Sequence, residues 1–334
     1  MSSGSRVKVW DGWRGVAILL VLIGHFAFTQ WVWEERLGVD VFFVLSGMLM
    51  CNILFIDRLS LRDFYIRRFS RVVPTLILFL CASFAVSVFL KYDFKISEFI
   101  ASAVFIRTYL PVEPIYFSTS LPTGHLWSLN VEEHSYIIMS IISLLLIARG
   151  KITLALFSIY LISVAINLYN YATLPNQAFY FSLIRTESAI GFIAFSAAYN
   201  LFRKDRSINL PNYSPLFLLI AAFSCYLEST PVWLTFLVGP ITLGIAVNHL
   251  VDSAKPIQQF LTLAPLRWFG MLSYSIYLWQ QIFYKLYYAL PGKALTGFVL
   301  SIAFGACSFY FFENPLRVYI NQRWSPNPQY RQTR

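Results

Sequence analysis

The sequence predicts an all-α, polytopic integral membrane protein with about ten transmembrane helices and one re-entrant or interfacial segment. Of the 334 residues, 57% are hydrophobic and only 13% are charged, whereas soluble domains carry about 25% charged residues. The apolar residues form long runs that approach the ~20 residues a helix needs to cross a bilayer. The chain lacks the series of ~10-residue alternating strands that is typical of an outer-membrane barrel.

The first apolar run is expected to be a membrane helix rather than a cleaved signal peptide. It contains Arg14 and His25, and no small-residue cleavage site follows it. The fourth run, 98–110, is short, so its length alone does not decide whether it crosses the membrane. The apolar runs lie at 13–33, 37–56, 73–90, 98–110, 125–148, 152–169, 179–201, 214–228, 232–250, 267–289 and 293–312.

Basic residues gather in a few of the connections, and the positive-inside rule places such connections in the cytoplasm. All of these basic connections fall on one side of the membrane only if the run 98–110 does not cross it. The charge pattern therefore predicts ten spanning helices, both termini in the cytoplasm, a re-entrant or interfacial 98–110 and a structured outer loop at 107–124. The basic residues are Arg58, Arg62, Arg67, Arg68 and Arg71, then Arg149 and Lys151, then Arg203, Lys204 and Arg206, and finally Arg317, Arg323, Arg331 and Arg334.

The chain is predicted to be a single transmembrane domain over 1–334 that ends in a cytoplasmic basic tail at 318–334. No internal repeat and no long soluble segment are evident, which gives no support to an inverted-repeat transporter. The net charge of +10 is explained first by topology and second by an anionic ligand at the cytoplasmic face. The four cysteines and four histidines have no metal-ligand or disulfide spacing, so no metal is expected.

Arg14 and His25 lie eleven residues apart in the first apolar run. In a helix this is about three turns, so both side chains fall on one face, about 16 Å apart along the axis. A charged side chain at mid-bilayer costs roughly 2.5–3.5 kcal/mol, and such residues usually face a protein interior or a watery cavity. The pair indicates a cation near the cytoplasmic mouth and a general base deeper in, because histidine titrates near neutral pH. An arginine anchor with a packing histidine is the alternative.

Arg67, Arg68 and Arg71 precede Pro74 in the first basic connection. At helical spacing, Arg71 shares a face with Arg67 or with Arg68, and arginine forks suit phosphates. This segment is therefore a candidate site for a ligand with several phosphates, and positive-inside anchoring alone is the alternative.

A polar stripe of His125, Ser128, Glu132 and Ser135 follows helical spacing at the start of the fifth apolar run. Two adjacent carboxylates, Glu132 and Glu133, before a long apolar run are unusual in a membrane protein. The stripe predicts a polar cavity wall near the outer leaflet, or else a wet helix entrance.

Arg185 and Glu187 lie inside the apolar run 179–201. Residues two apart do not face each other on a helix, so each is expected to pair with another helix, either structurally or at a site.

A second stripe, in the run 267–289, consists of Ser273, Tyr277, Gln280 and Tyr284. It predicts either a polar, aromatic wall for a sugar or a packed aromatic helix. Glu313, at the end of the last run, is expected to pair with a cytoplasmic arginine.

Six motifs follow one another along nearly the whole chain. They are Arg14 with His25 after ten intervening residues; Gly38-Val39-Asp40-Val41-Phe42-Phe43-Val44-Leu45-Ser46-Gly47; Arg68 and Arg71 followed by Pro74; His125-Leu126-Trp127-Ser128-Leu129 with Glu132; Leu272-Ser273-Tyr274-Ser275-Ile276-Tyr277-Leu278-Trp279; and Phe312-Glu313-Asn314-Pro315. In this order they resemble the motifs of the membrane-bound acyltransferase family 3.

The resemblance implies an O-acyltransferase of the bacterial inner membrane. It would move an acetyl group from cytoplasmic acetyl-CoA to a hydroxyl group of an extracytoplasmic glycan, with lipopolysaccharide O-antigen as the expected acceptor. Exopolysaccharide, peptidoglycan and lipo-oligosaccharide are the family's other acceptors. Because no esterase-like C-terminal domain is evident, the chain resembles the standalone type. The expected partners are acetyl-CoA, the glycan and membrane lipids, without nucleic acid.

The resemblance also implies residue roles. His25 would be the catalytic base, or would carry the acyl group briefly, while Glu132 would orient His25 or hold the sugar. Where many members carry a histidine after Leu-Trp, this chain has Gln280, which cannot titrate, so His25 is expected to be the essential base. Arg14, Arg68 and Arg71 would bind acetyl-CoA phosphates, and the acceptor would meet His125, Ser128, Arg185, Glu187, Tyr277 and Gln280.

A transporter or flippase of an anionic lipid or metabolite is the competing class, because the Arg14–His25 face alone would permit it. The missing repeats and the set of motifs argue against it. A third class, a non-catalytic scaffold, would leave the buried Arg14, His25, Glu132 and Arg185 unexplained.

Overall fold

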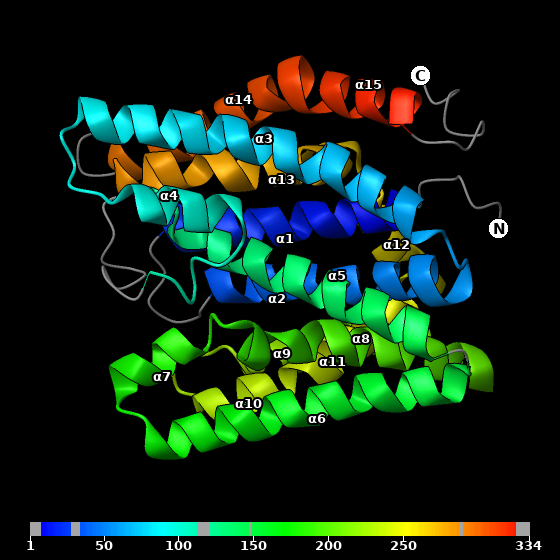
Figure 1. The fold of residues 1–334 in the computed structure, drawn as a ribbon. Helices are drawn as coiled ribbons and strands as arrows, with labels where there is room; N and C mark the ends of the chain where they lie inside the picture. The colour runs from blue at the N-terminus through cyan, green and yellow to red at the C-terminus, as the bar shows by residue number, and fades with distance from the viewer. Residues whose placement is uncertain (1–7, 28–33, 112–120, 147, 287–289, 325–334) are drawn as a thin grey trace. The chain divides into compact units, whose positions relative to one another are not determined.

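The computed structural model describes residues 8–27, 34–111, 121–146, 148–286 and 290–324 (Figure 1). The regular secondary structure of these residues is helical, with no β-strand among them. The prediction of an all-α protein is therefore confirmed. The helices are α1 (Lys8–Phe26), α2 (Glu34–Cys51), α3 (Leu61–Phe89), α4 (Ile96–Ala103), α5 (Trp127–Leu145), α6 (Arg149–Thr173), α7 (Asn176–Ser182), α8 (Thr186–Arg206), α9 (Ser214–Ser224), α10 (Val232–Leu237), α11 (Gly239–His249), α12 (Lys255–Leu261), α13 (Ala264–Lys285), α14 (Lys293–Ser308) and α15 (Asn314–Trp324).

Six helical segments of the described chain are long and apolar enough to cross a membrane, or seven if the bent pair α7 and α8 is one span. The prediction of about ten spans is therefore wrong in its number, although the several apolar helices agree with a membrane protein. The six are Lys8–Phe26, Glu35–Ile56, Leu61–Phe89, Gly150–Thr173, Val232–Asp252 and Lys293–Trp324.

Length and polarity explain the difference. The run 214–228 forms α9, which has only 11 residues. Helices α5 and α13 have 19 and 22 residues, but their polar stripes leave them outside the set of apolar spans. The run 98–110 forms α4, whose 8 residues are too few to cross a bilayer; its re-entrant or interfacial position stays a prediction. Part of the loop expected at 107–124 lies outside the described residues.

The chain divides into two compact units that interleave in sequence. Unit 1 comprises Met1–Arg58 and Val131–Met271, and unit 2 comprises Leu59–Asn130 and Leu272–Arg334. The single acyltransferase domain over 1–334 stays a prediction, as does the cytoplasmic tail, of which residues 325–334 lie outside the described chain.

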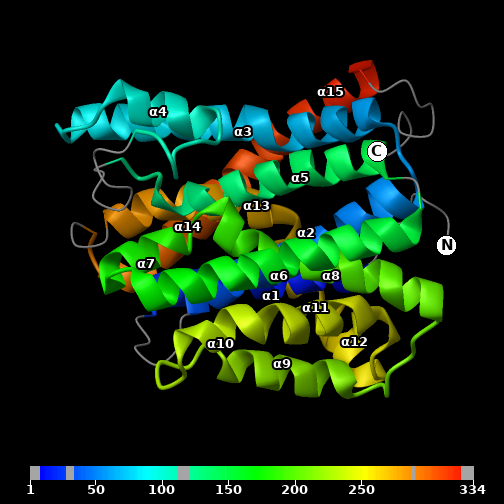
Figure 2. The same ribbon diagram turned by 60° about the horizontal axis from the view of Figure 1, so that its bottom comes forward.

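In unit 1, α8 packs against α6, α2 and α11, and Figure 1 and Figure 2 both show α6, α8 and α11 side by side. Two glycines of the second motif allow this close packing. A Cβ atom on Gly47 would lie 2.2 Å from the carbonyl oxygen of Ile193 in α8, and one on Gly38 would lie 2.8 Å from that of Ala17 in α1. Such contacts exclude larger residues, so both glycines set how closely α2 approaches its neighbours.

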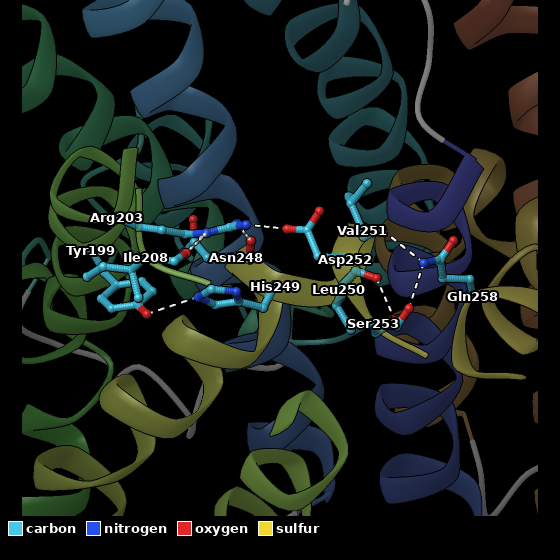
Figure 3. A network of polar contacts seen from close by, with 10 residues as sticks. All are labelled: Tyr199, Arg203, Ile208, Asn248, His249, Leu250, Val251, Asp252, Ser253 and Gln258. Atoms are coloured by element: carbon cyan, nitrogen blue, oxygen red, sulfur yellow. Dashed lines mark hydrogen bonds and ion pairs between the residues drawn. The ribbon is translucent and has the colours of Figure 1, made fainter. Parts of the chain in front are cut away.

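A polar network joins the last turns of α8 and α11 (Figure 3). The guanidinium group of Arg203 donates to the backbone carbonyl of Asn248 and to the carboxylate of Asp252. The hydroxyl of Tyr199 lies 3.0 Å from Nε2 of His249. Because the last carbonyls of a helix have no partner inside it, Arg203 satisfies one of those of α11 and fixes the two helix ends together.

In unit 2, α15 packs along α3, as both ribbon views show (Figure 1, Figure 2). The hydroxyl of Ser70 donates to Asn321 at 3.1 Å, and the rings of Phe69 and Trp324 stack with their centroids 6.0 Å apart. The core of unit 2 joins α3, the turn at Gly124–Leu126 with the start of α5, and the second half of α13. This core consists of Val72, Leu76, Phe79, Leu80, Leu126, Leu129, Leu278 and Ile282.

Candidate active site

Arg14 and His25 both lie on α1, as the sequence predicts, and both are half-buried. The Nη1 of Arg14 lies 3.1 Å from Oδ1 of Asp11, a buried carboxylate one turn earlier. This ion pair holds the arginine at the start of the helix. Since α1 is continuous between the two residues, they share one helical face with an axial separation of about 16 Å.

The hydrogen bond of His25 fixes where its proton sits. Nδ1 lies 2.9 Å from the backbone carbonyl oxygen of Val21. A carbonyl oxygen only accepts hydrogen bonds, so Nδ1 carries the proton in the neutral ring and the lone pair is on Nε2. His25 is therefore in the tautomer in which Nε2 can take up a proton.

Glu132 contacts the second motif within unit 1. The hydroxyl of Ser46 in α2 donates to Oε1 of Glu132 in α5 at 2.7 Å. Ser46 belongs to the second motif, and the sequence predicts no role for it. A hydroxyl bond to a carboxylate is charge-assisted and directional, so Ser46 fixes the orientation of Glu132.

Arg185 and Glu187 lie at a helix break. Helix α7 ends at Ser182 and α8 begins at Thr186, with a bend of 46° between them. Arg185 is the exposed N-cap of α8, and Glu187 is half-buried in its first turn. The position of both residues within a span stays a prediction, since α7 and α8 together form one candidate span that is bent at this break.

His134, a residue without a predicted role, ties the first turn of α8 to α5. The Nδ1 of His134 lies 2.7 Å from Oγ1 of Thr186. His134 follows Glu132 and Glu133 directly, so the acidic start of α5 and the break before α8 are joined within unit 1.

In unit 2, the structure brings together three of the residues predicted for the acceptor. The hydroxyl of Tyr277 lies 2.6 Å from that of Ser128 and donates to the backbone carbonyl of His125 at 2.7 Å. The buried His125 ring meets the edge of Phe79 at a centroid distance of 5.3 Å, and the Tyr277 ring at 5.0 Å. His125 and Ser128 of the first polar stripe thus face Tyr277 of the second.

Gln280 is fully buried one turn beyond Tyr277. Its Nε2 lies 3.4 Å from Oε1 of Gln281, and its own Oε1 has no hydrogen-bond partner among the described residues. A buried amide oxygen without a partner is costly, so this position has an unused acceptor that a hydroxyl group would satisfy.

Arg68 and Arg71 lie near the start of α3 and are half-buried. The helix begins after Ser60, whose side chain accepts a hydrogen bond from the backbone of Asp63. In the same unit, Ser275 donates to the buried carboxylate of Glu313 at 2.7 Å. Arg68 and Arg71 supply guanidinium groups of the kind that bind phosphate.

The eleven predicted site residues are divided between the units. Unit 1 holds Arg14, His25, Glu132, Arg185 and Glu187, and unit 2 holds Arg68, Arg71, His125, Ser128, Tyr277 and Gln280. Among the residues that the structure describes, no cluster of three or more His, Cys, Asp or Glu side chains is arranged to hold a metal ion.

Comparison with known proteins gives one family and a set of relatives. The family described as "Acyltransferase domain" matches residues 7–313. The O-acetyltransferase OatA of Staphylococcus aureus strain NCTC 8325 is 26% identical over 345 residues, which cover 92% of this chain and 56% of that protein. OatA of strain COL gives the same values. The chain thus spans about half the length of these curated relatives. No solved structure matches it.

Proposed function

Because the chain belongs to the acyltransferase family 3, whose domain matches residues 7–313, we propose that it is a membrane O-acetyltransferase. It moves an acetyl group from cytoplasmic acetyl-CoA to a hydroxyl group of an extracytoplasmic glycan. The relatives named as O-acetyltransferases support acetyl as the group transferred and oxygen as its acceptor.

The observation that carries this proposal is the placement of Arg14 and His25 on one helix, with the lone pair of His25 on Nε2. In the proposed reaction, Nε2 takes the proton of the acceptor hydroxyl. The oxygen attacks the thioester carbon, the carbon–sulfur bond breaks, and the thiolate leaves and takes up a proton. The products are an O-acetyl ester and free CoA, and the histidine returns to its neutral form.

Acetyl-CoA is assigned to the basic residues. Arg14, Arg68 and Arg71 bind the phosphates of CoA, since guanidinium forks bind phosphate with two parallel hydrogen bonds. The pantetheine arm then extends along α1. Its length is similar to the rise of about 16 Å between Arg14 and His25, which brings the thioester to the base.

The acceptor is assigned to the polar stripes. Sugars offer many hydroxyl groups, and they suit the aromatic and hydroxyl side chains of Tyr277 and Ser128, the unused acceptor of Gln280, and His125. Arg185 and Glu187 contribute two charged side chains at the break before α8, and Glu132 orients His25 or holds the sugar. We assign O-antigen as the glycan and the bacterial inner membrane as the location, with both termini in the cytoplasm, where basic residues gather.

The experiment is to express the full chain and its His25→Ala variant in the host and to analyse the envelope glycan by mass spectrometry. The proposal predicts acetyl esters, each adding the mass of one acetyl group, only with the unsubstituted chain. A glycan that stays unmodified with the unsubstituted chain, or is modified equally with both, would overturn it. An altered glycan amount without acetyl esters would instead favour a transporter.

A further inference from the structure

Asp40, Arg36 and Tyr226 form a polar triad in unit 1 around a buried carboxylate. Asp40, in the second motif, is fully buried on α2. Its Oδ2 accepts hydrogen bonds from Nε of Arg36 at 2.9 Å and from the hydroxyl of Tyr226 at 2.8 Å. The second oxygen, Oδ1, is buried and takes no hydrogen bond from the described residues.

This arrangement is a poor choice for stability alone. Burying a carboxylate and a guanidinium group has a desolvation cost that their attraction often fails to offset. An unsatisfied carboxylate oxygen adds to that cost. What the triad does instead is hold groups in place, because Asp40 fixes the guanidinium group of Arg36 on the same helix and the hydroxyl of Tyr226, which follows α9.

The segment that Arg36 reaches is the break between α7 and α8. Its Nη1 donates to the backbone carbonyl of Leu183 at 3.1 Å, and its guanidinium carbon lies 5.6 Å from the centre of the Phe236 ring. Leu183 follows the last residue of α7, where helix carbonyls have no partner of their own. The arginine thus holds the chain where it leaves α7.

Two further contacts hold the next residues of the break. His134 bonds the side chain of Thr186, as described above. The backbone carbonyl of Ser188 accepts from Ser163 at 2.8 Å and from Asn167 at 2.9 Å, both on α6. Residues 183–188 are therefore tied to α2, α5 and α6, and the break is a fixed piece of backbone rather than a free hinge.

The exposed Arg185 and the half-buried Glu187 extend from this fixed piece. We infer that Asp40, Arg36 and Tyr226 are positioning residues, which fix the α7–α8 break so that Arg185 and Glu187 can bind the hydroxyl groups of the acceptor glycan. This inference rests on the proposed function. It adds that acceptor binding depends on the Asp40–Arg36–Tyr226 triad, which contacts neither substrate directly.

The test compares Asp40→Asn and Tyr226→Phe with Tyr199→Phe in the purified full chain in lipid nanodiscs. Tyr199→Phe is the matched control, because it also removes a tyrosine hydroxyl bonded to a buried partner in unit 1 (Figure 3). Tyr199 lies thirteen residues along α8 from Thr186, which is about 20 Å.

The first measurement is hydrogen exchange of backbone amides. Both triad variants are expected to speed exchange in residues 183–190 by about tenfold, because a local contact is lost, while α1 is unchanged. Tyr199→Phe should leave 183–190 unchanged. Unchanged exchange in the triad variants, or equal acceleration in 183–190 and α1, would overturn the inference.

The second measurement is thiol release from acetyl-CoA, with de-O-acetylated polysaccharide extracted from the host envelope as the probe acceptor. The triad variants should raise the KM for the extract by at least about fivefold and leave the KM for acetyl-CoA unchanged, as expected for lost acceptor binding. A fall in kcat alone, or equal changes in both KM values, would overturn the inference. If the unsubstituted chain releases no thiol, the proposed function fails, and hydrogen exchange alone decides whether the triad positions the break.

Discussion

The hydroxyl groups of Ser128 and Tyr277 lie 2.6 Å apart, although the two residues are 149 positions apart in sequence. Tyr277 also donates to the backbone carbonyl of His125 at 2.7 Å. The hydroxyl of Ser128 lies 3.3 Å from the same carbonyl oxygen, so the two hydroxyl groups and this carbonyl form one hydrogen-bonded cluster in which either hydroxyl can donate to the other. Tyr277 therefore holds both His125 and the first turn of α5 in place.

Tyr277→Phe should slow acetyl transfer without unfolding the protein. The change leaves the ring in place but removes a hydroxyl that makes two hydrogen bonds, each with a net value of about 1 kcal/mol. Freed from this contact, the turn at His125 no longer presents the acceptor site in one geometry. We expect kcat/KM for the glycan to fall by about tenfold, the equivalent of about 1.4 kcal/mol, in a thiol-release assay.

Tyr274→Phe is the control for that variant. Its hydroxyl also donates to a backbone carbonyl, that of Val72, at 2.8 Å, from the same helix α13. We expect its kcat/KM to stay within about threefold of the unsubstituted value, since a neutral hydrogen bond away from the His125 turn contributes little net free energy. Equal losses in the two variants would show that Tyr277 acts only through helix packing.

Gly47→Ala should destabilise unit 1. The added Cβ would lie 2.2 Å from the carbonyl oxygen of Ile193, so α2 and α8 must separate, at a cost of about 1–3 kcal/mol for an overpacked core. In nanodiscs, the thermal unfolding temperature should fall by several degrees. Gly150→Ala is the control because a Cβ there meets nothing within 4 Å, and a comparable fall in that variant would contradict the packing argument.

Arg71→Ala should weaken use of acetyl-CoA and leave use of the glycan unchanged. Losing one guanidinium–phosphate contact costs about 1.5–3 kcal/mol, as for hydrogen bonds to charged groups, so the KM for acetyl-CoA should rise by at least about tenfold. Arg62→Ala, an exposed arginine in the first turn of the same helix, is the matched control. A change in the KM for the glycan alone would assign Arg71 to the acceptor instead.

The helical class and the contents of α1 were predictable from local pattern. Long apolar runs and an eleven-residue spacing are properties of one stretch of chain. Arg14 and His25 therefore lie on one helix, as their spacing predicts. The number of spans was not predictable in the same way. Helices α5 and α13 are long enough, but their polar stripes are satisfied inside the protein by partners such as Ser46 for Glu132 and Ser128 for Tyr277.

Long-range pairings account for what the sequence did not reveal. The stripes of His125 and Tyr277 were each visible, but their contact depends on the packing of α13 against the start of α5. The break between α7 and α8 contains neither glycine nor proline. The nearest preceding proline, Pro175, lies before α7, so no local signal marks the break. It is stabilised by distant contacts such as that of Arg36 with Leu183.

The measurement that tests the central claim most directly is thiol release from acetyl-CoA by the purified chain and its His25→Ala variant, with host envelope polysaccharide as the acceptor. Loss of a general base should slow the reaction by roughly 10²–10⁴-fold, while acetyl-CoA still raises the thermal stability of the variant, because the residues assigned to its phosphates are intact. An acetyl transfer rate within about tenfold of the unsubstituted chain would be too small a loss for a general base and would contradict the assignment of His25.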